Sequence, residues 1–277
     1  MLRWRLLTAL TLVPCLLWLV WLAPPEALPA AFAGIAILGA WEWTSLMNLT
    51  SYIARLTYTL VILGIVLGGW LWLRAGGSAL PVLIMGALWW LIAIACLAEF
   101  GRKPVKRVPH LLVSAPIGVV VLVSFWFAIV AIHGGADFGP YWVTMLLLLV
   151  GGSDTGGYVA GRTWGRRKLA PRISPDKTWE GAVGSVVLGV AWGGAYYVCG
   201  RSLDFAPAGV SPVVFLALAL VTTVVAIVGD LFESMMKRRR GIKDSGRLLP
   251  GHGGVLDRID GLLAAAPILA LGVRGVS

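Results

Sequence analysis

The chain has 277 residues, of which 58% are hydrophobic and only 13% are charged, and its mean hydropathy is +0.86. A water-soluble domain carries roughly 25% charged residues, so this composition excludes a soluble globular protein and indicates a single polytopic membrane domain. The net charge of +10 predicts anionic partners, either lipid headgroups or phosphates. Cys15, Cys96 and Cys199 lie in or beside apolar runs without metal-ligand spacing, so we expect neither a disulfide framework nor a thiol catalyst.

Apolar runs long enough to cross a membrane recur along the whole chain. A helix needs about 20 apolar residues to span the hydrocarbon core. Nine runs meet this need, near residues 5–23, 28–48, 56–73, 78–98, 110–133, 141–161, 179–199, 211–236 and 259–275. The alternative for the first run is a signal peptide with Arg3 and Arg5 at its start, but the run is longer than the usual apolar region of about 7–15 residues. The sequence thus predicts an all-α, polytopic integral membrane protein with about nine transmembrane helices.

The basic residues fall on one side of these predicted spans. If the N-terminus is cytoplasmic, all 23 Lys and Arg residues except Arg74, Arg201 and Arg274 lie in cytoplasmic segments. The positive-inside rule then predicts a cytoplasmic N-terminus and an outside C-terminus. We expect a multi-pass protein of a bacterial-type cytoplasmic (inner) membrane, with its active site facing the cytoplasm.

The chain changes in character near residue 140. We expect one membrane domain over residues 1–277, in which 1–139 are mainly scaffold helices and 140–277 form the catalytic portion. Acidic residues at membrane depth are costly and are therefore functional candidates. Five acidic residues lie in or at the cytoplasmic ends of predicted helices: Asp154, Glu180, Asp230, Glu233 and Asp260. For any one of them alone, an ion pair with a nearby Lys or Arg is an equally good explanation.

Two polar segments precede the eighth predicted span. The glycines of residues 151–161 are typical either of close helix packing or of backbone that contacts a ligand. The sequence favours neither interpretation over the other. Ser174 followed by Pro175 predicts the start of a helix, with Ser174 as its N-cap. With Lys177, that helix start would form an anion site, and the alternative is an ordinary cap with cationic interface anchors.

A third polar segment lies between Gly229 and Asp260. Asp257 and Asp260 are three residues apart and so share a helix face, as do Asp230 and Glu233. Carboxylates beside a dense basic loop suit Mg²⁺ with phosphates. A zinc site is excluded because the segment has one His and no Cys, and the chain has no Walker A loop.

The run from Ser234 to Asp260 resembles the signature of the phosphatidate cytidylyltransferase family. It reads S-x-M-K-R, four residues, K-D-x-G, and then L-P-x-H-G-G-V-x-D-R-I-D, without departure from the family pattern. Residues 153–162 and 168–181 also resemble the family, so the resemblance covers roughly 151–260. It implies that CTP and phosphatidic acid react with Mg²⁺ to give CDP-diacylglycerol and pyrophosphate for phospholipid biosynthesis. The partners are then CTP, phosphatidic acid and the lipid bilayer, with no nucleic acid; analogy with the family also points to a homodimer.

The resemblance and the residue types together suggest roles for individual side chains. Three carboxylates are expected to bind metal, with room for a second ion: Asp230, Asp257 and Asp260. Five residues are expected to act in catalysis: Lys177, Lys237, Lys243, Asp244 and Arg258. Six more are expected to bind substrate: Asp154, Ser174, Arg238, His252, Gly253 and Gly254. Arg239 and Arg240 fall outside the signature positions and are interpreted as membrane-surface charges.

Two other functions would use similar residues. A CTP-dependent lipid kinase, or another CTP-using prenyl-lipid enzyme, would bind the same nucleotide but transfer a different group. An ion-coupled transporter would also embed acidic residues, but should spread them across the membrane rather than collect them at one face.

Overall fold

A computed structural model describes residues 13–103, 111–135, 138–207, 209–246, 248 and 253–275. Residues 13–21 are helical, and the helices that follow are α2 (Ala27–Leu46), α3 (Tyr52–Arg74), α4 (Leu80–Arg102), α5 (Leu111–Gly135), α6 (Gly139–Trp164), α7 (Trp179–Ser202), α8 (Pro212–Arg240) and α9 (Leu256–Arg274). The predicted all-α membrane fold is confirmed. One small addition is an antiparallel hairpin between α6 and α7, with strands β1 (Lys168–Ala170) and β2 (Ser174–Thr178).

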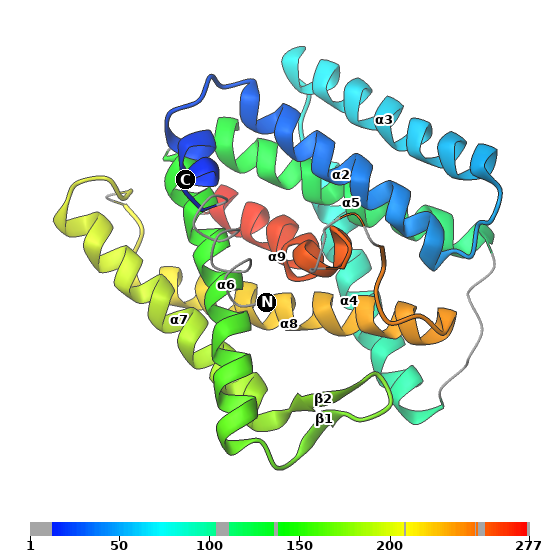
Figure 1. Ribbon diagram of the computed structural model, residues 1–277. Coiled ribbons are helices and arrows are strands. Elements are labelled where there is room, and N and C mark those ends of the chain that lie inside the picture. The colour runs from blue at the N-terminus through cyan, green and yellow to red at the C-terminus, as the bar shows by residue number, and fades with distance from the viewer. Residues whose placement is uncertain are drawn as a thin grey trace.

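Seven helices of the described chain, α2 to α8, are long and apolar enough to cross a membrane. α9 forms where the ninth span was expected, but it is not one of the seven. It is enclosed by protein instead, because α4, α5, α6 and α8 all pack against it (Figure 1). A helix that faces protein rather than lipid does not need an apolar surface all round, which explains how α9 accommodates charged residues at its start.

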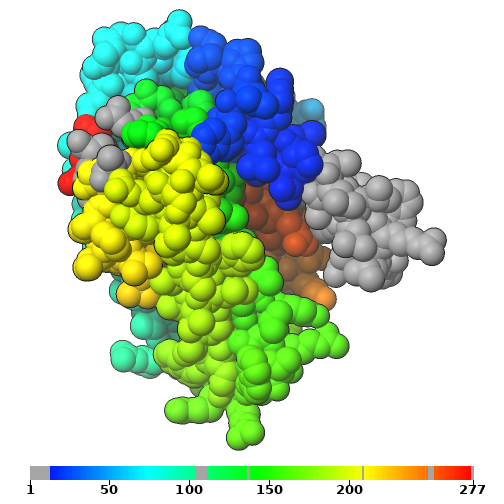
Figure 2. Space-filling view, turned by 90° about the vertical axis from the view of Figure 1, so that its left-hand side faces the viewer, coloured from blue at the N-terminus to red at the C-terminus, as the bar shows by residue number. Residues whose placement is uncertain are grey.

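α7 packs against α6 through small residues. Every buried residue of α7 is Gly or Ser, and its opposite side lies at the surface (Figure 2). A Cβ atom on Gly156 of α6 would lie 2.2 Å from the carbonyl oxygen of Gly184, and one on Gly152 would lie 2.8 Å from the Trp192 ring. Close backbone approach of this kind is typical of membrane helix pairs. For these glycines of the 151–161 segment, the structure therefore favours helix packing over ligand binding.

The loops gather at two ends of the helix bundle. At the end that carries β1 and β2, called here the hairpin end, Arg172 donates to the Gly101 carbonyl (2.8 Å) and Arg240 donates to the Ser45 carbonyl (3.3 Å). At the opposite end, Arg74 and Glu26 form an ion pair at 3.3 Å. This sorting is the one expected when successive helices cross the membrane in alternating directions.

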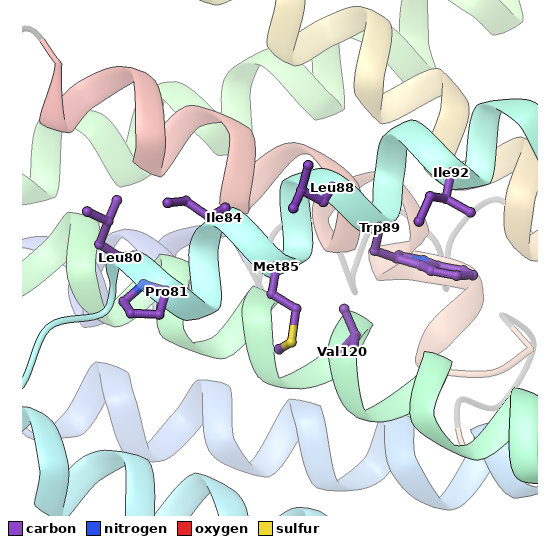
Figure 3. A pocket seen from close by; sticks show the side chains of 8 residues that line it. All are labelled: Leu80, Pro81, Ile84, Met85, Leu88, Trp89, Ile92 and Val120. Carbon is purple, nitrogen blue, oxygen red and sulfur yellow. The ribbon is translucent and has the colours of Figure 1, made fainter.

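A groove of about 620 Å³ runs along α4 (Figure 3). Its lining is apolar throughout and comes from Leu80, Pro81, Ile84, Met85, Leu88, Trp89, Ile92 and Val120. Such a surface suits hydrocarbon chains but offers no group for phosphate chemistry. The polar residues that the sequence singled out lie elsewhere, where α6, α8 and α9 meet the hairpin.

Candidate active site

Three carboxylates from three helices lie within electrostatic range of one another near the hairpin end. Asp154 of α6, Asp230 of α8 and Asp260 of α9 lie close enough to interact electrostatically. Gly229 permits this approach, because a Cβ atom there would lie 2.3 Å from the carbonyl oxygen of Asp260. We call Asp154, Asp230 and Asp260 the acidic cluster; its members are far apart in the sequence and are brought together only by the packing of the three helices.

Lys177 reaches the acidic cluster from β2. Its ammonium group forms an ion pair with Asp230, and both side chains are partly exposed. The hairpin is held in place by Arg238, whose Nε donates to the carbonyl of Ile173 (3.0 Å). Thus Arg238, expected to bind substrate, has a structural partner, while Lys177 is placed directly against the carboxylates.

The prediction that Ser174 and Pro175 begin a helix is wrong. Both residues lie in β2, where Ser174 pairs with Ala170. The helix begins at Trp179, and its N-cap is Thr178, whose hydroxyl accepts from the Gly181 amide (3.1 Å). The physical reason is that a residue before Pro favours extended backbone, which the hairpin satisfies. Ser174 therefore does not present a helix N-terminus to a phosphate.

Glu180, one of the five acidic candidates, has a structural partner as well. Its carboxylate accepts from the backbone amides of Arg166 (3.0 Å) and Arg167 (3.2 Å). These bonds tie the start of α7 to the segment that leaves α6. Glu180 is thus a hairpin-anchoring residue and lies outside the acidic cluster.

Lys237 bridges two carboxylates beside the acidic cluster. Its ammonium group donates to Glu233 (2.8 Å) and to Asp257 (2.7 Å), and all three side chains are largely buried. Asp257 also accepts from the amides of Ser245 (3.1 Å) and Gly254 (2.8 Å). Lys237 was expected to act in catalysis; in the structure it pairs with acidic side chains. It thereby connects α8 to residues 243–246 and 253–257 of the signature run, called here the signature segment.

The glycines of the signature segment are required by local geometry. Gly253 has φ +83°, a backbone conformation that L-residues rarely adopt, and a Cβ atom there would lie 2.9 Å from Oδ2 of Asp257. A Cβ atom on Gly254 would lie 2.4 Å from the Ser245 hydroxyl oxygen. Both glycines, expected to bind substrate, thus let the backbone close around Asp257. His252 lies outside the described residues.

A second cavity, of about 640 Å³, adjoins the signature segment. Lys243 and Asp244 line it from the segment after α8, and Arg55 and Trp41 line it from the scaffold half. The Arg55 guanidinium stacks over the Trp41 ring at 4.3 Å from its centroid. This polar cavity therefore combines charged groups of both signs with an aromatic surface.

The remaining basic residues near α8 have specific neighbours. Arg239 lies over the Phe100 ring, 5.4 Å from its centroid, and Arg240 donates to the Ser45 carbonyl. Arg239 and Arg240, interpreted as membrane-surface charges, are partly exposed and also contact α4 and α2 of the protein. Arg258 is exposed and interacts electrostatically with Asp154, so it lies beside the acidic cluster.

One buried residue at this site comes from the scaffold half. Glu42 of α2 is only 2% exposed, and its Oε2 accepts from the Leu256 amide (2.8 Å) and the Ser245 hydroxyl (3.4 Å). Sequence reasoning gave Glu42 no role, although an acid is rare among the first five predicted spans and was a signal. Its partners lie more than 200 positions away, so no local pattern could reveal them.

The donor chemistry of this region fits Mg²⁺. The ion prefers oxygen ligands, and the acidic cluster supplies carboxylates, with Lys177 paired to one of them; nearby, Oε1 of Glu233 is buried without a hydrogen-bond partner. Asp257 is oriented by hydrogen bonds from Lys237, Ser245 and Gly254, which occupy both of its oxygens; Asp230 and Asp260 are the expected metal ligands that lie in the acidic cluster itself. Within the described ranges, no three Asp, Glu, His or Cys side chains are already arranged around one point.

The chain is similar to known proteins over nearly its whole length. The sequence model of the "Cytidylyltransferase family" matches residues 3–275. A protein named phosphatidate cytidylyltransferase from Haemophilus influenzae is 33% identical over 288 residues, covering 98% of each chain. The protein of that name from Pseudomonas aeruginosa is 35% identical over 98% of this chain and 96% of its own. The one from Brucella suis is 37% identical over 98% and 92%, respectively.

Proposed function

Because the chain belongs to the cytidylyltransferase family, we propose that it transfers the cytidylyl group of CTP to phosphatidic acid. The products are CDP-diacylglycerol, which serves phospholipid biosynthesis, and pyrophosphate. The observation that carries this proposal is the near full-length similarity to three proteins named phosphatidate cytidylyltransferase. The acidic cluster and its neighbouring cations supply chemistry suited to that reaction.

The reaction needs charge stabilisation more than it needs a base. An oxygen of the phosphatidate monoester is already anionic and forms a bond to the α-phosphorus of CTP. The bond from that phosphorus to the oxygen bridging the β-phosphate breaks, and pyrophosphate leaves with the electron pair. Bringing two polyanions together is the main obstacle, and positioned cations lower it.

Two sets of residues would share this work. Lys177 and Arg258 lie beside the acidic cluster and would hold phosphate oxygens near the transferred phosphorus. Lys243 lines the polar cavity and would hold the outer phosphates of CTP or the departing pyrophosphate. Lys237 would act indirectly, by keeping Asp257 and the signature segment in place.

Mg²⁺ is the metal that this chemistry favours. Asp230 and Asp260 of the acidic cluster, with the adjoining Asp257, would hold it, and the bound ion would act as a Lewis acid that neutralises phosphate charge. Asp154 would complete the negative environment of the ion. A second metal ion would find further carboxylate oxygens at Glu233.

The location of the site is part of the proposal. We place the protein in a bacterial cytoplasmic membrane with the hairpin end facing the cytoplasm, where CTP is present. The lipid would enter sideways and leave its acyl chains in the bilayer. A homodimer remains a prediction from the family resemblance.

Acceptor specificity tests this function. Purified protein supplied with CTP and Mg²⁺ should convert phosphatidic acid to CDP-diacylglycerol and leave diacylglycerol unchanged, because only the former has a phosphate monoester. Turnover of diacylglycerol to phosphatidic acid, with release of CDP, would replace this proposal with a lipid kinase.

A further inference from the structure

Glu42 connects the scaffold half of the chain to the signature segment. It lies near the end of α2, is 2% exposed, and makes its hydrogen bonds to residues that follow α8. Oε2 accepts from the Leu256 amide at 2.8 Å, at the first residue of α9. It also accepts from the Ser245 hydroxyl at 3.4 Å. One carboxylate thus holds both the start of α9 and the stretch that follows the end of α8.

Two signature glycines fit against this carboxylate. A Cβ atom on Gly246 would lie 2.1 Å from Oε1 of Glu42, and a Cβ atom on Gly254 would lie 2.6 Å from Oε2. A shift of the carboxylate away from Gly246 would disturb the hydrogen bonds that it accepts from the Leu256 amide and the Ser245 hydroxyl. Gly246 and Gly254 therefore leave the space that the Glu42 carboxylate occupies.

The contacts of Glu42 lead on to the acidic residues of the site. Ser245, whose hydroxyl donates to Glu42, donates its backbone amide to Asp257 (3.1 Å). Asp257 in turn accepts from Lys237 (2.7 Å). Glu42 itself also lines the polar cavity, together with Lys243. The position of Glu42 thus fixes one wall of that cavity and the start of the helix that presents Asp257 and Asp260.

We infer that Glu42 is a positioning residue for the nucleotide half of the reaction. It holds residues 242–246 and 253–256 in the arrangement that places Lys243 for CTP and Asp257 beside the metal ion. This inference rests on the proposed function, because CTP is the ligand assigned to the polar cavity. It does not involve the apolar groove along α4, whose lining suits acyl chains and has no residue in common with this cavity.

Steady-state kinetics separate this role from a general structural one. Glu42→Ala should lower kcat/KM for CTP by about 10-fold or more, as expected for loss of a buried charge-assisted hydrogen bond. The KM for phosphatidic acid should change by less than about 3-fold, since residues of the polar cavity do not line the α4 groove. Glu42→Gln keeps one acceptor oxygen and should restore most of the CTP activity. If Glu42→Ala does not fold, Glu42→Asp replaces it, because its shorter side chain withdraws the carboxylate.

A pair of substitutions tests the direct contact. Gly246→Ala alone should lower activity by about 10-fold, because its methyl group overlaps Glu42. In the Glu42→Ala background the same substitution should cause no further loss, which is a coupling of about 10-fold between the two positions. Gly34→Ala is the matched control on α2, where an added Cβ atom meets nothing within 4 Å.

Hydrogen exchange provides a readout that does not depend on turnover. The amides of Ser245 and Leu256 should exchange about 10-fold faster in Glu42→Ala than in the wild type, and near the wild-type rate in Glu42→Gln. Wild-type protein that makes no CDP-diacylglycerol would overturn the proposed function, while the exchange rates would still test Glu42. Additive effects of Glu42→Ala and Gly246→Ala, or unchanged exchange at Leu256, would overturn the positioning role.

Discussion

Lys177 and Lys237 carry the same charge, but their surroundings differ in how readily they let a phosphate bind. Lys237 is largely buried between Glu233 and Asp257, so both of its anionic partners are already part of the protein. Lys177 is more exposed and comes from a short hairpin, where it meets the acidic cluster at its open side. A phosphate can therefore approach Lys177 more readily than Lys237.

Removal of single carboxylates tests the metal assignment. Asp230→Asn and Asp260→Asn should each lower turnover by on the order of 100-fold while the protein stays folded. Each change keeps the size of the side chain but removes an anionic ligand, so the Mg²⁺ concentration needed for half-maximal rate should rise. Asp204→Asn is the control: Asp204 is exposed at the opposite end and has φ +56°, which Asn also tolerates. Well-folded Asn variants with wild-type rate and metal dependence would rule the metal assignment out.

Substitutions of basic residues in the same region should affect either catalysis or stability, depending on the residue. Lys177→Ala should lower turnover by on the order of 100-fold, because it removes a cation from the transferring phosphates. Arg239→Ala should leave the KM for CTP unchanged but lower the unfolding temperature, because Arg239 packs over Phe100. Kinetics combined with thermal unfolding would check both. Equal kinetic losses at the two positions would indicate that the basic residues attract anions only through their total charge.

At the scale of helices and strands, the glycines of α6 show how sequence and structure relate. Their spacing indicated either close packing or a ligand-binding backbone, and only the position of α7 decides between these. The pairing of Gly156 with Gly184 depends on two segments that a hairpin brings together. That pairing makes the α6–α7 interface a unit whose stability can be measured.

A single methyl group should discriminate the packed glycines from the free ones. Gly156→Ala should destabilise the protein by about 1–3 kcal/mol, because its Cβ atom would overlap the backbone of α7. Gly151→Ala on the same helix should be nearly neutral, since nothing lies within 4 Å of its Cβ position. Thermal unfolding in detergent measures the difference. Equal unfolding temperatures for both variants would contradict the close packing of α6 against α7.

The helices were predictable from the sequence, but the hairpin and Glu42 were not. A run of about 20 apolar residues is visible in the sequence itself, so the spans from α2 to α8 could be located from composition alone. Ser174 and Pro175 satisfy the local rule for a helix start, yet strand pairing with Ala170 is a contact that this rule does not include. Glu42 acts through partners more than 200 positions away. Residue type thus indicated the chemistry of the site, while tertiary contacts determined which residues position it.

At the scale of the whole molecule, the basic residues predict which end of the bundle meets the cytoplasm. Asp176 lies in the hairpin, and Asp204 lies in the loop between α7 and α8 at the opposite end. Both are exposed, so a cysteine at either position is accessible to a water-soluble reagent. The two sites therefore report on opposite faces of the membrane.

Thiol labelling of intact cells tests this orientation. In a chain without Cys15, Cys96 and Cys199, Asp204→Cys should react with an impermeant maleimide from outside. Asp176→Cys should react only after the cells are opened, because the positive-inside rule places the hairpin in the cytoplasm. Labelling of Asp176→Cys from outside would reverse the topology and remove the proposed access of CTP to the site.

The fate of the phosphorus atoms of CTP tests the central claim most directly. Purified protein would be given phosphatidic acid, Mg²⁺ and CTP that carries radioactive phosphorus at either the α or the γ position. Cytidylyl transfer predicts that the α label enters the lipid, as CDP-diacylglycerol, while the γ label leaves as pyrophosphate. Incorporation of the γ label into lipid, with release of CDP, would contradict the account.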